Sequence, residues 1–191
     1  MKYRTDKISS LYDEVKATQL ASLLLKFNGG SMDYLKCIKL LYAIEKEALN
    51  RWLRPVIYDE LYSLPHGQVV SQTLDRAEYR IHPAKTFWSN HLRTTPDNTI
   101  HLDAECGIDN LSRAEIDLIR EVYEKNKDKT PKQLMDEHHN PDLFPEWKNP
   151  GQSRIKTKYS DLLTLLSKNQ EQIEEFEADL KELANLEALT R

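Results

Sequence analysis

The spacing of apolar residues predicts one long helix around which the other segments pack. Between Ser31 and Pro55 apolar side chains recur every three or four residues, and they cover more of the circumference than the stripe of a surface helix does. We therefore expect a central helix that Ser31 caps and Pro55 ends. The predicted core positions on it are Leu35, Ile38, Leu41, Tyr42, Leu49 and Trp52, and the predicted polar face holds Lys36, Lys39, Lys46 and Asn50.

One acidic residue lies on the apolar side of this helix. Glu45 stands between Leu41 and Leu49. A buried carboxylate is costly unless it is paired or hydrogen-bonded. We therefore expect Glu45 to belong to the structural core with an arginine, histidine or tyrosine as its partner, in preference to a catalytic role.

The segments on either side of the central helix predict a helical hairpin and a small amount of sheet. Residues 15–27 have helical apolar spacing, and the short Asn-Gly-Gly run after them allows only a tight reversal. Residues 56–64 are rich in β-branched and aromatic side chains, which indicates a short extended segment. Residues 99–102 alternate polar and apolar, so we expect them to pair with 56–64. Residues 71–81 predict another helix.

Two segments in the second half of the chain carry strong signals for the start of a helix. Ser112 is followed three residues later by Glu115, and Thr130 by Gln133, which is the capping-box pattern. Pro131 also suits a first helical position. These signals predict helices that begin at Ser112 and Thr130, the second ending near residue 138.

The C-terminal part of the chain has a different character. Residues 158–189 predict a long amphipathic helix, and residues 169–191 carry seven acidic residues against only Lys181 and Arg191. Three fates are open for its apolar stripe: packing back on the domain, pairing as a coiled-coil homodimer, or docking to another protein. The stripe consists of Tyr159, Leu162, Leu166, Ile173, Phe176, Leu180 and Leu183.

Together these segments predict a mostly α fold, a compact helical domain with a minor short β-hairpin and a long C-terminal amphipathic helix. The predicted organisation is a polar N-terminal segment 1–14, a helical domain 15–152 and an acidic helical extension 153–191.

Composition narrows the function classes. The formal net charge of −4 argues against general nucleic-acid binding, which needs clustered lysine and arginine. Cys37 and Cys106 lack metal-type spacing and fit buried thiols in a reducing compartment. No apolar run is long enough to cross a bilayer, and the N-terminus lacks a signal-peptide pattern. We therefore expect a soluble, cytoplasmic protein with no membrane contact.

The residues that most often carry chemistry show no catalytic pattern. The six histidines form neither an HExxH motif nor a cysteine–histidine quartet, and no nucleophile elbow or phosphate-binding glycine loop occurs. We expect His66 to support the turn at Gly67, and His138 to end a helix as a cation that favours the helix dipole. The sequence predicts no enzyme, no metal and no cofactor.

Two long runs carry a resemblance to a known family. KLLYAIEKEALNRWLRPVIYDELYSLPHGQV (39–69) and LSRAEIDLIREVYEKNKDKTPKQLMDEHH (111–139), followed by Trp147-Lys148, resemble the Panacea (SocA-like) domain over about residues 15–147. The shared landmarks are a KLLYxAxxxAL-type helix, a glycine turn, a capped helix, a short helix ending in histidine, and a closing Trp-Lys. Gln68 stands where many members have proline, and residues 140–146 make a longer link than usual.

The resemblance implies an antitoxin that neutralises a cognate protein toxin by direct stoichiometric binding. The alternatives are an adaptor that delivers a toxin to a protease, a DNA-binding autorepressor and a metal-dependent enzyme. Trp147 is expected in the core. The candidate partner-binding residues are His66, Gly67, Ile173, Phe176, Leu180 and Leu183.

Overall fold

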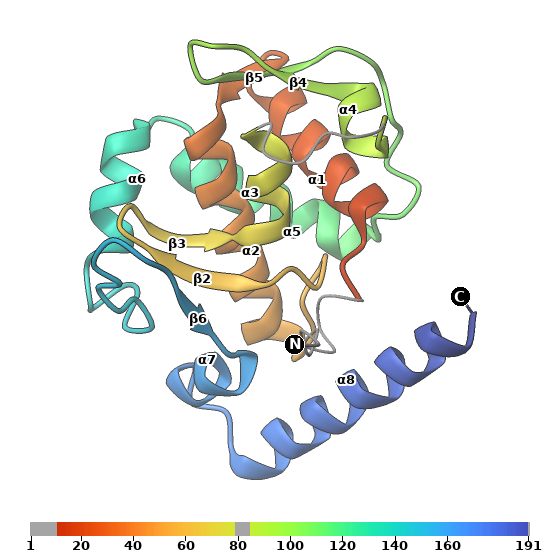
Figure 1. Ribbon diagram of the computed structural model, residues 1–191, viewed down its shortest axis with the longest axis vertical. Helices are drawn as coiled ribbons and strands as arrows, with labels where there is room; N and C mark the ends of the chain where they lie inside the picture. Colours follow the sequence, from red (N-terminus) through yellow and green to blue (C-terminus); the bar gives the residue numbers. More distant parts are fainter. Residues whose placement is uncertain (1–10, 79–84, 191) are drawn as a thin grey trace.

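The computed structural model describes residues 11–78 and 85–190. They form a mostly helical fold with two small antiparallel sheets and a long C-terminal helix, which confirms the predicted fold class (Figure 1). Most of the predicted segment 1–14 and the end of the predicted helix 71–81 lie outside the described residues. In chain order the elements are α1 (Glu14–Phe27), β1 (Ser31–Asp33), α2 (Tyr34–Trp52), β2 (Leu61–Leu64), β3 (Gly67–Val70), α3 (Ser71–Ala77), α4 (Phe87–His91), β4 (Leu92–Thr94), β5 (Thr99–Leu102), α5 (Arg113–Asn126), α6 (Pro131–His138), β6 (Ile155–Thr157), α7 (Tyr159–Leu165) and α8 (Gln170–Thr190).

α2 is the central helix. It contacts α1, α5, α6, α7 and β3, so neighbours cover most of its circumference (Figure 1). It begins later than predicted, because Asp33 and not Ser31 accepts the capping hydrogen bond from the Lys36 backbone N–H. It ends at Trp52, before Pro55, where Leu53 adopts a left-handed conformation with φ of 52°. Among the predicted core residues, Leu35 is half-buried, and those without exposed surface are Ile38, Leu41, Tyr42, Glu45 and Leu49.

The predicted polar face of α2 is wrong at two lysines. Lys39 has 0% of its surface exposed and Lys36 has 8%. Charge alone assigns a lysine to solvent, but the end of α5 and the strand β3 lie over this side of α2. The Lys36 ammonium finds a partner there, donating a 2.6 Å hydrogen bond to the Lys127 carbonyl oxygen.

The predicted burial of Trp52 is also wrong, because 39% of its surface is exposed. The residue is the last of α2. The chain turns away after it, so no neighbouring helix covers this end as closely as the middle of α2 is covered. Helical spacing placed Trp52 on the correct side of the helix but does not reveal where the covering elements end.

Glu45 is buried but has a different partner from the one predicted. Its Oε1 accepts hydrogen bonds from the backbone N–H groups of Val56 (2.8 Å) and Ile57 (3.0 Å). Burial raises the pKa of Glu45 to about 8, against the lowering effect of these two hydrogen bonds. The carboxyl group therefore fastens the segment after α2 to the helix itself.

The two sheets differ from the single minor sheet of the prediction. β5 pairs with β1 and β4, with Met32 opposite Ile100, so its predicted pairing with 56–64 is wrong. β2 forms a hairpin with β3 and also pairs with β6, with Ser63 opposite Ile155. Both sheets thus join segments far apart in the chain, which local periodicity does not specify.

The two capping boxes are confirmed. Ser112 accepts from the Glu115 backbone N–H, and Glu115 accepts in return from Ser112. Thr130 and Gln133 repeat the arrangement at the start of α6, with Pro131 at the first helical position. Each box satisfies N–H groups that a helix start otherwise leaves unpaired.

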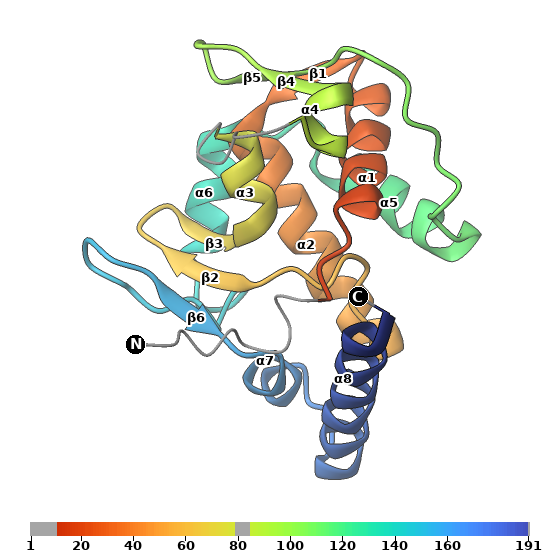
Figure 2. The same ribbon diagram turned by 45° about the vertical axis from the view of Figure 1, so that its right-hand side comes forward.

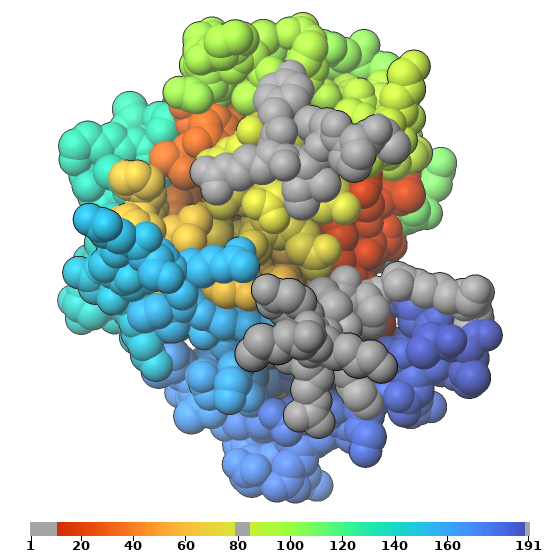
Figure 3. Space-filling model, in the orientation of Figure 1, coloured from red at the N-terminus to blue at the C-terminus, as the bar shows by residue number. Residues whose placement is uncertain are grey.

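The predicted helix over 158–189 is divided into α7 and α8. Ser167 between them has a φ of 60°, which a continuous helix does not allow. The Asn169 side chain then accepts a 2.9 Å hydrogen bond from the Gln172 backbone N–H and starts α8. α7 packs against the body, whereas α8 runs along its lower edge (Figures 2 and 3).

Candidate partner-binding site

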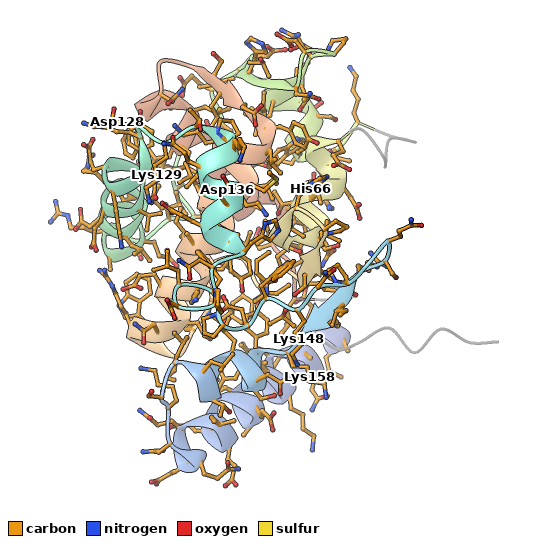
Figure 4. All side chains as sticks on the ribbon, turned by 90° about the vertical axis from the view of Figure 1, so that its left-hand side faces the viewer. His66, Asp128, Lys129, Asp136, Lys148 and Lys158 are labelled. Carbon is orange, nitrogen blue, oxygen red and sulfur yellow. The ribbon has the colours of Figure 1, made fainter. Side chains whose placement is uncertain are left out.

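The β2–β3 hairpin ends in a tight turn that only glycine fits. Gly67 has a φ of 91°, a backbone conformation that residues with a β-carbon disfavour. A β-carbon at this position would lie 2.6 Å from Cβ of His138 and 3.0 Å from Nζ of Lys39. The turn therefore sits directly on α6 and α2, while the side chain of His66 at its tip is exposed (Figure 4).

Lys39 holds the turn from below. Its Nζ donates a 2.7 Å hydrogen bond to the carbonyl oxygen of Gln68. Burial lowers the pKa of Lys39 to about 7, because the protein interior disfavours the ammonium form. The Gln68 side chain donates in turn to the Ser63 hydroxyl across the hairpin, at 3.1 Å.

His138, at the end of α6, closes the other side of the turn. Its ring stacks on Phe144, with centroids 3.9 Å apart, and only 2% of the residue is exposed. Burial, and then the charges of Lys39 and Lys46, hold the pKa of His138 well below its usual value. The ring is therefore neutral at pH 7, and the predicted cationic role at the helix dipole is wrong.

The loop after α6 is tied to α2 by a buried carboxylate. Glu146 accepts a 2.9 Å hydrogen bond from the Tyr42 hydroxyl and forms an ion pair with Lys46 at 2.9 Å. Lys46 also donates to the Leu143 carbonyl oxygen and lies over the Phe144 ring. These contacts fix the loop that carries the aromatic face against His138.

Trp147 connects the same loop to the hairpin. Its Nε1 donates a 3.1 Å hydrogen bond to the Leu64 carbonyl oxygen, and its ring lies 4.5 Å from that of His139. The Lys148 backbone N–H donates to Ser63. Trp147 is half-buried, so it joins two surface segments and does not lie in the centre of the core, where the sequence placed it.

These contacts define the Gly67 turn assembly: the hairpin tip, Lys39, His138 and the Glu146–Trp147 loop. Lys39 and His138 are shielded from solvent and lie directly under the turn. Within residues 11–78 and 85–190, no three histidine, cysteine or acidic side chains gather as metal ligands would. The assembly can present a rigid surface.

The family match covers the same elements. The model of the family described as "Antitoxin SocA-like, Panacea domain" matches residues 37–148, more than half of the chain. The chain belongs to this antitoxin family. The match runs from α2 through the hairpin, α5 and α6 to Lys148, so the Gly67 turn assembly lies within the Panacea domain. No curated protein and no solved structure matches the chain.

The other predicted partner-binding residues lie on α8, outside the matched Panacea domain, and they divide into two groups. Ile173 and Phe176 are 8% and 4% exposed, and the Phe176 ring lies 5.8 Å from that of Tyr159 on α7. Leu180 is half-buried, and Leu183 is 40% exposed. The structure does not bring α8 together with the Gly67 turn (Figure 4).

Sequence reasoning missed two residues of the turn assembly. Lys39 was assigned to the solvent because of its charge, and Glu146 lies in a proline-rich loop without periodicity. The one available signal was the position of Lys39 beside the nearly continuous apolar surface of α2. A helix enclosed on most sides leaves few positions where a lysine reaches solvent.

Proposed function

We propose that this protein is an antitoxin that neutralises a cognate protein toxin by direct, stoichiometric binding. Membership of the SocA-like antitoxin family supports this proposal. According to this proposal, the protein acts in the cytoplasm as a binding protein and not as an enzyme. The helices in the described parts of the chain include none that is long and apolar enough to cross a membrane.

The observation that carries the proposal is the construction of the Gly67 turn assembly. Hydrogen bonds from Lys39 to Gln68 and from Trp147 to Leu64 hold the two sides of an exposed turn, and the Tyr42–Glu146 hydrogen bond holds the neighbouring loop. A surface that is already rigid loses little conformational entropy when a partner binds. Binding through such a surface accounts for buried polar groups that contact the backbone of the turn.

The test is co-expression with the protein encoded by the neighbouring reading frame. The proposal predicts that this neighbour alone stops growth, that the present chain restores it, and that the two purified proteins form a complex of fixed stoichiometry in light scattering. Absence of both rescue and complex would refute the proposal.

A second arm separates binding from protease delivery. Stoichiometric neutralisation predicts undiminished growth rescue in cells that lack ATP-dependent proteases. Rescue that disappears in those cells, with toxin levels rising, would instead identify the protein as a proteolysis adaptor.

A further inference from the structure

α8 does not lie flat on the body but encloses a groove with it. The α8 groove has a volume of about 840 Å³, within the range of ligand sites. One wall is formed by the end of α2, the segment after it and the start of α1, and the other wall by α8. Figure 2 shows α8 beside the end of α2. Its lining includes the apolar Trp52, Val56, Leu180 and Leu183 and the acidic Glu175, Asp179 and Glu182.

The apolar lining is open to a partner. Trp52 is 39% exposed and Leu183 is 40% exposed, although both line a concave surface. Tryptophan in a concave site is the residue type that most often dominates a binding interface. Val56, in contrast, is buried and is fastened by Glu45 through its backbone N–H, so this wall is firmly held.

The charge of the groove is one-sided. Glu175, Asp179 and Glu182 are exposed along α8, and they form no ion pair with any lysine or arginine of the described chain. Two basic residues line the opposite wall, but Lys16 and Arg54 both face Glu115, at 2.7 Å and 3.7 Å. An apolar floor with an uncompensated acidic rim is complementary to a basic amphipathic segment.

We propose that the α8 groove binds a basic amphipathic helix of the toxin, with its apolar face on Trp52 and Leu183 and its lysine or arginine side chains on the acidic rim. This inference rests on the function proposed above. It places partner specificity in α8, which lies outside the family match of residues 37–148.

Two other occupants are outcomes that the experiment distinguishes from a toxin helix. A second copy would bring an α8 with the same acidic residues against the rim, which costs like-charge repulsion. The chain's own residues 1–10 carry Lys2, Arg4 and Lys7 and precede Leu11, which lines the groove. The experiment includes an arm for each.

The test measures peptide binding by fluorescence anisotropy. The probe is a labelled amphipathic helix of lysine and leucine, ~18 residues or about five turns long. Its controls are a scrambled peptide and a glutamate-for-lysine peptide. The proposal predicts that the probe binds at least about tenfold more tightly than either control, and more weakly at ~0.5 M salt.

Matched variants locate the binding. L183K and D179K, at exposed positions in the groove, should each weaken probe binding by about tenfold or more, whereas L165K on α7 and E171K at the start of α8 should not change it, because neither residue lines the groove. Circular dichroism must show unchanged folding in all four. Equal weakening in the control variants would overturn the proposal, because binding would then reflect charge alone.

The remaining arms separate the occupants and the two proposals. Probe binding that requires deletion of residues 1–10 would assign the groove to the chain's own segment, and a dimer abolished by L183K would assign it to a second copy; either result overturns the inference. The toxin encoded by the neighbouring reading frame should bind the variants L183K and D179K more weakly than the unaltered chain. If it binds both variants as tightly as the unaltered chain, the groove proposal fails and the antitoxin function stands. If it does not bind the unaltered chain, the antitoxin function fails.

Discussion

The Gly67 turn and α8 are both candidate binding surfaces, but different contacts hold them to the body. The turn is fixed by hydrogen bonds from Lys39 on α2 and from Trp147 in the loop after α6, and by close packing against His138 on α6. The large buried side chains of α8, Ile173 and Phe176, lie in its first half, whereas its second half buries only the small Ala184. Polar contacts require defined partners at defined distances, whereas an apolar contact tolerates substitution. The Gly67 turn, which depends on defined polar contacts, lies inside the matched Panacea domain. The helix α8, whose apolar contacts tolerate substitution, lies outside it.

The largest expected effect is at the turn. Gly67→Ala should destabilise the protein by about 2–5 kcal/mol, because the new β-carbon meets the Cβ of His138 at 2.6 Å and the positive φ disfavours alanine. Urea unfolding measures this change. Gly151 also has a positive φ, of 61°, but open space around it, so Gly151→Ala should cost only about 1 kcal/mol. Equal costs would mean that the turn is not packed as described.

The next effect is the pH dependence that Lys39 gives to the turn. Its pKa is lowered from 10.5 to about 7 in the folded protein. Above about pH 7 the unfolded chain therefore holds a proton that the folded protein has released, so this residue makes stability rise with pH up to about 10.5. Lys39→Met should remove that contribution. Between about pH 8 and about pH 9, the free energy of unfolding measured in urea should then rise less steeply with pH than it does for the unaltered chain. An unchanged slope would contradict a lowered pKa of Lys39 in the folded protein.

Glu45, on the α8 side of the molecule, should make stability change with pH in the opposite direction. Its pKa is raised from 4.5 to about 8, so in this interval the folded protein keeps a proton that the unfolded chain has lost. Its contribution to stability therefore falls as pH rises from about 4.5 to about 8. Glu45→Gln should remove this fall, as measured by the melting temperature across the interval. Persistence of the full fall in the variant would assign it to other groups.

The smallest effect is expected in the second half of α8. Leu183→Ala should change stability by less than about 1 kcal/mol, because 40% of the residue is already exposed. Phe176→Ala, at a position 4% exposed, should cost about 3 kcal/mol or more. Thermal unfolding of both variants checks the pair. Similar losses would show that α8 is packed along its whole length.

The structure also shows which parts of the fold can be predicted from a single sequence. Helix starts at Ser112 and Thr130 were predicted because a capping box involves residues only three positions apart. The pairing of β5 and the addition of β6 to β2 were not, since register between distant segments depends on the whole fold.

The candidate site was predicted only in part, for a related reason. Gly67 was found because a glycine after Pro65 and His66 is typical of a tight turn, where its freedom to adopt a positive φ is needed. Lys39 was placed in solvent, because the cost of burying an ammonium group is recovered only by a distant carbonyl oxygen, at Gln68. Trp52 was placed in the core, because helical spacing predicts the direction in which a side chain points. It does not predict how far the neighbouring elements extend along the helix.

The pairing of β6 with β2 also bears on the order in which the protein is assembled during translation. Tyr62 pairs with Lys156, and Lys156 forms an ion pair with Glu60, so the free edge of the hairpin is covered by a strand from late in the chain. At synthesis rates of about 5–20 residues per second, the interval between the two strands lasts about 5–20 s. During that time the nascent hairpin presents an unpaired strand edge to chaperones and to neighbouring chains.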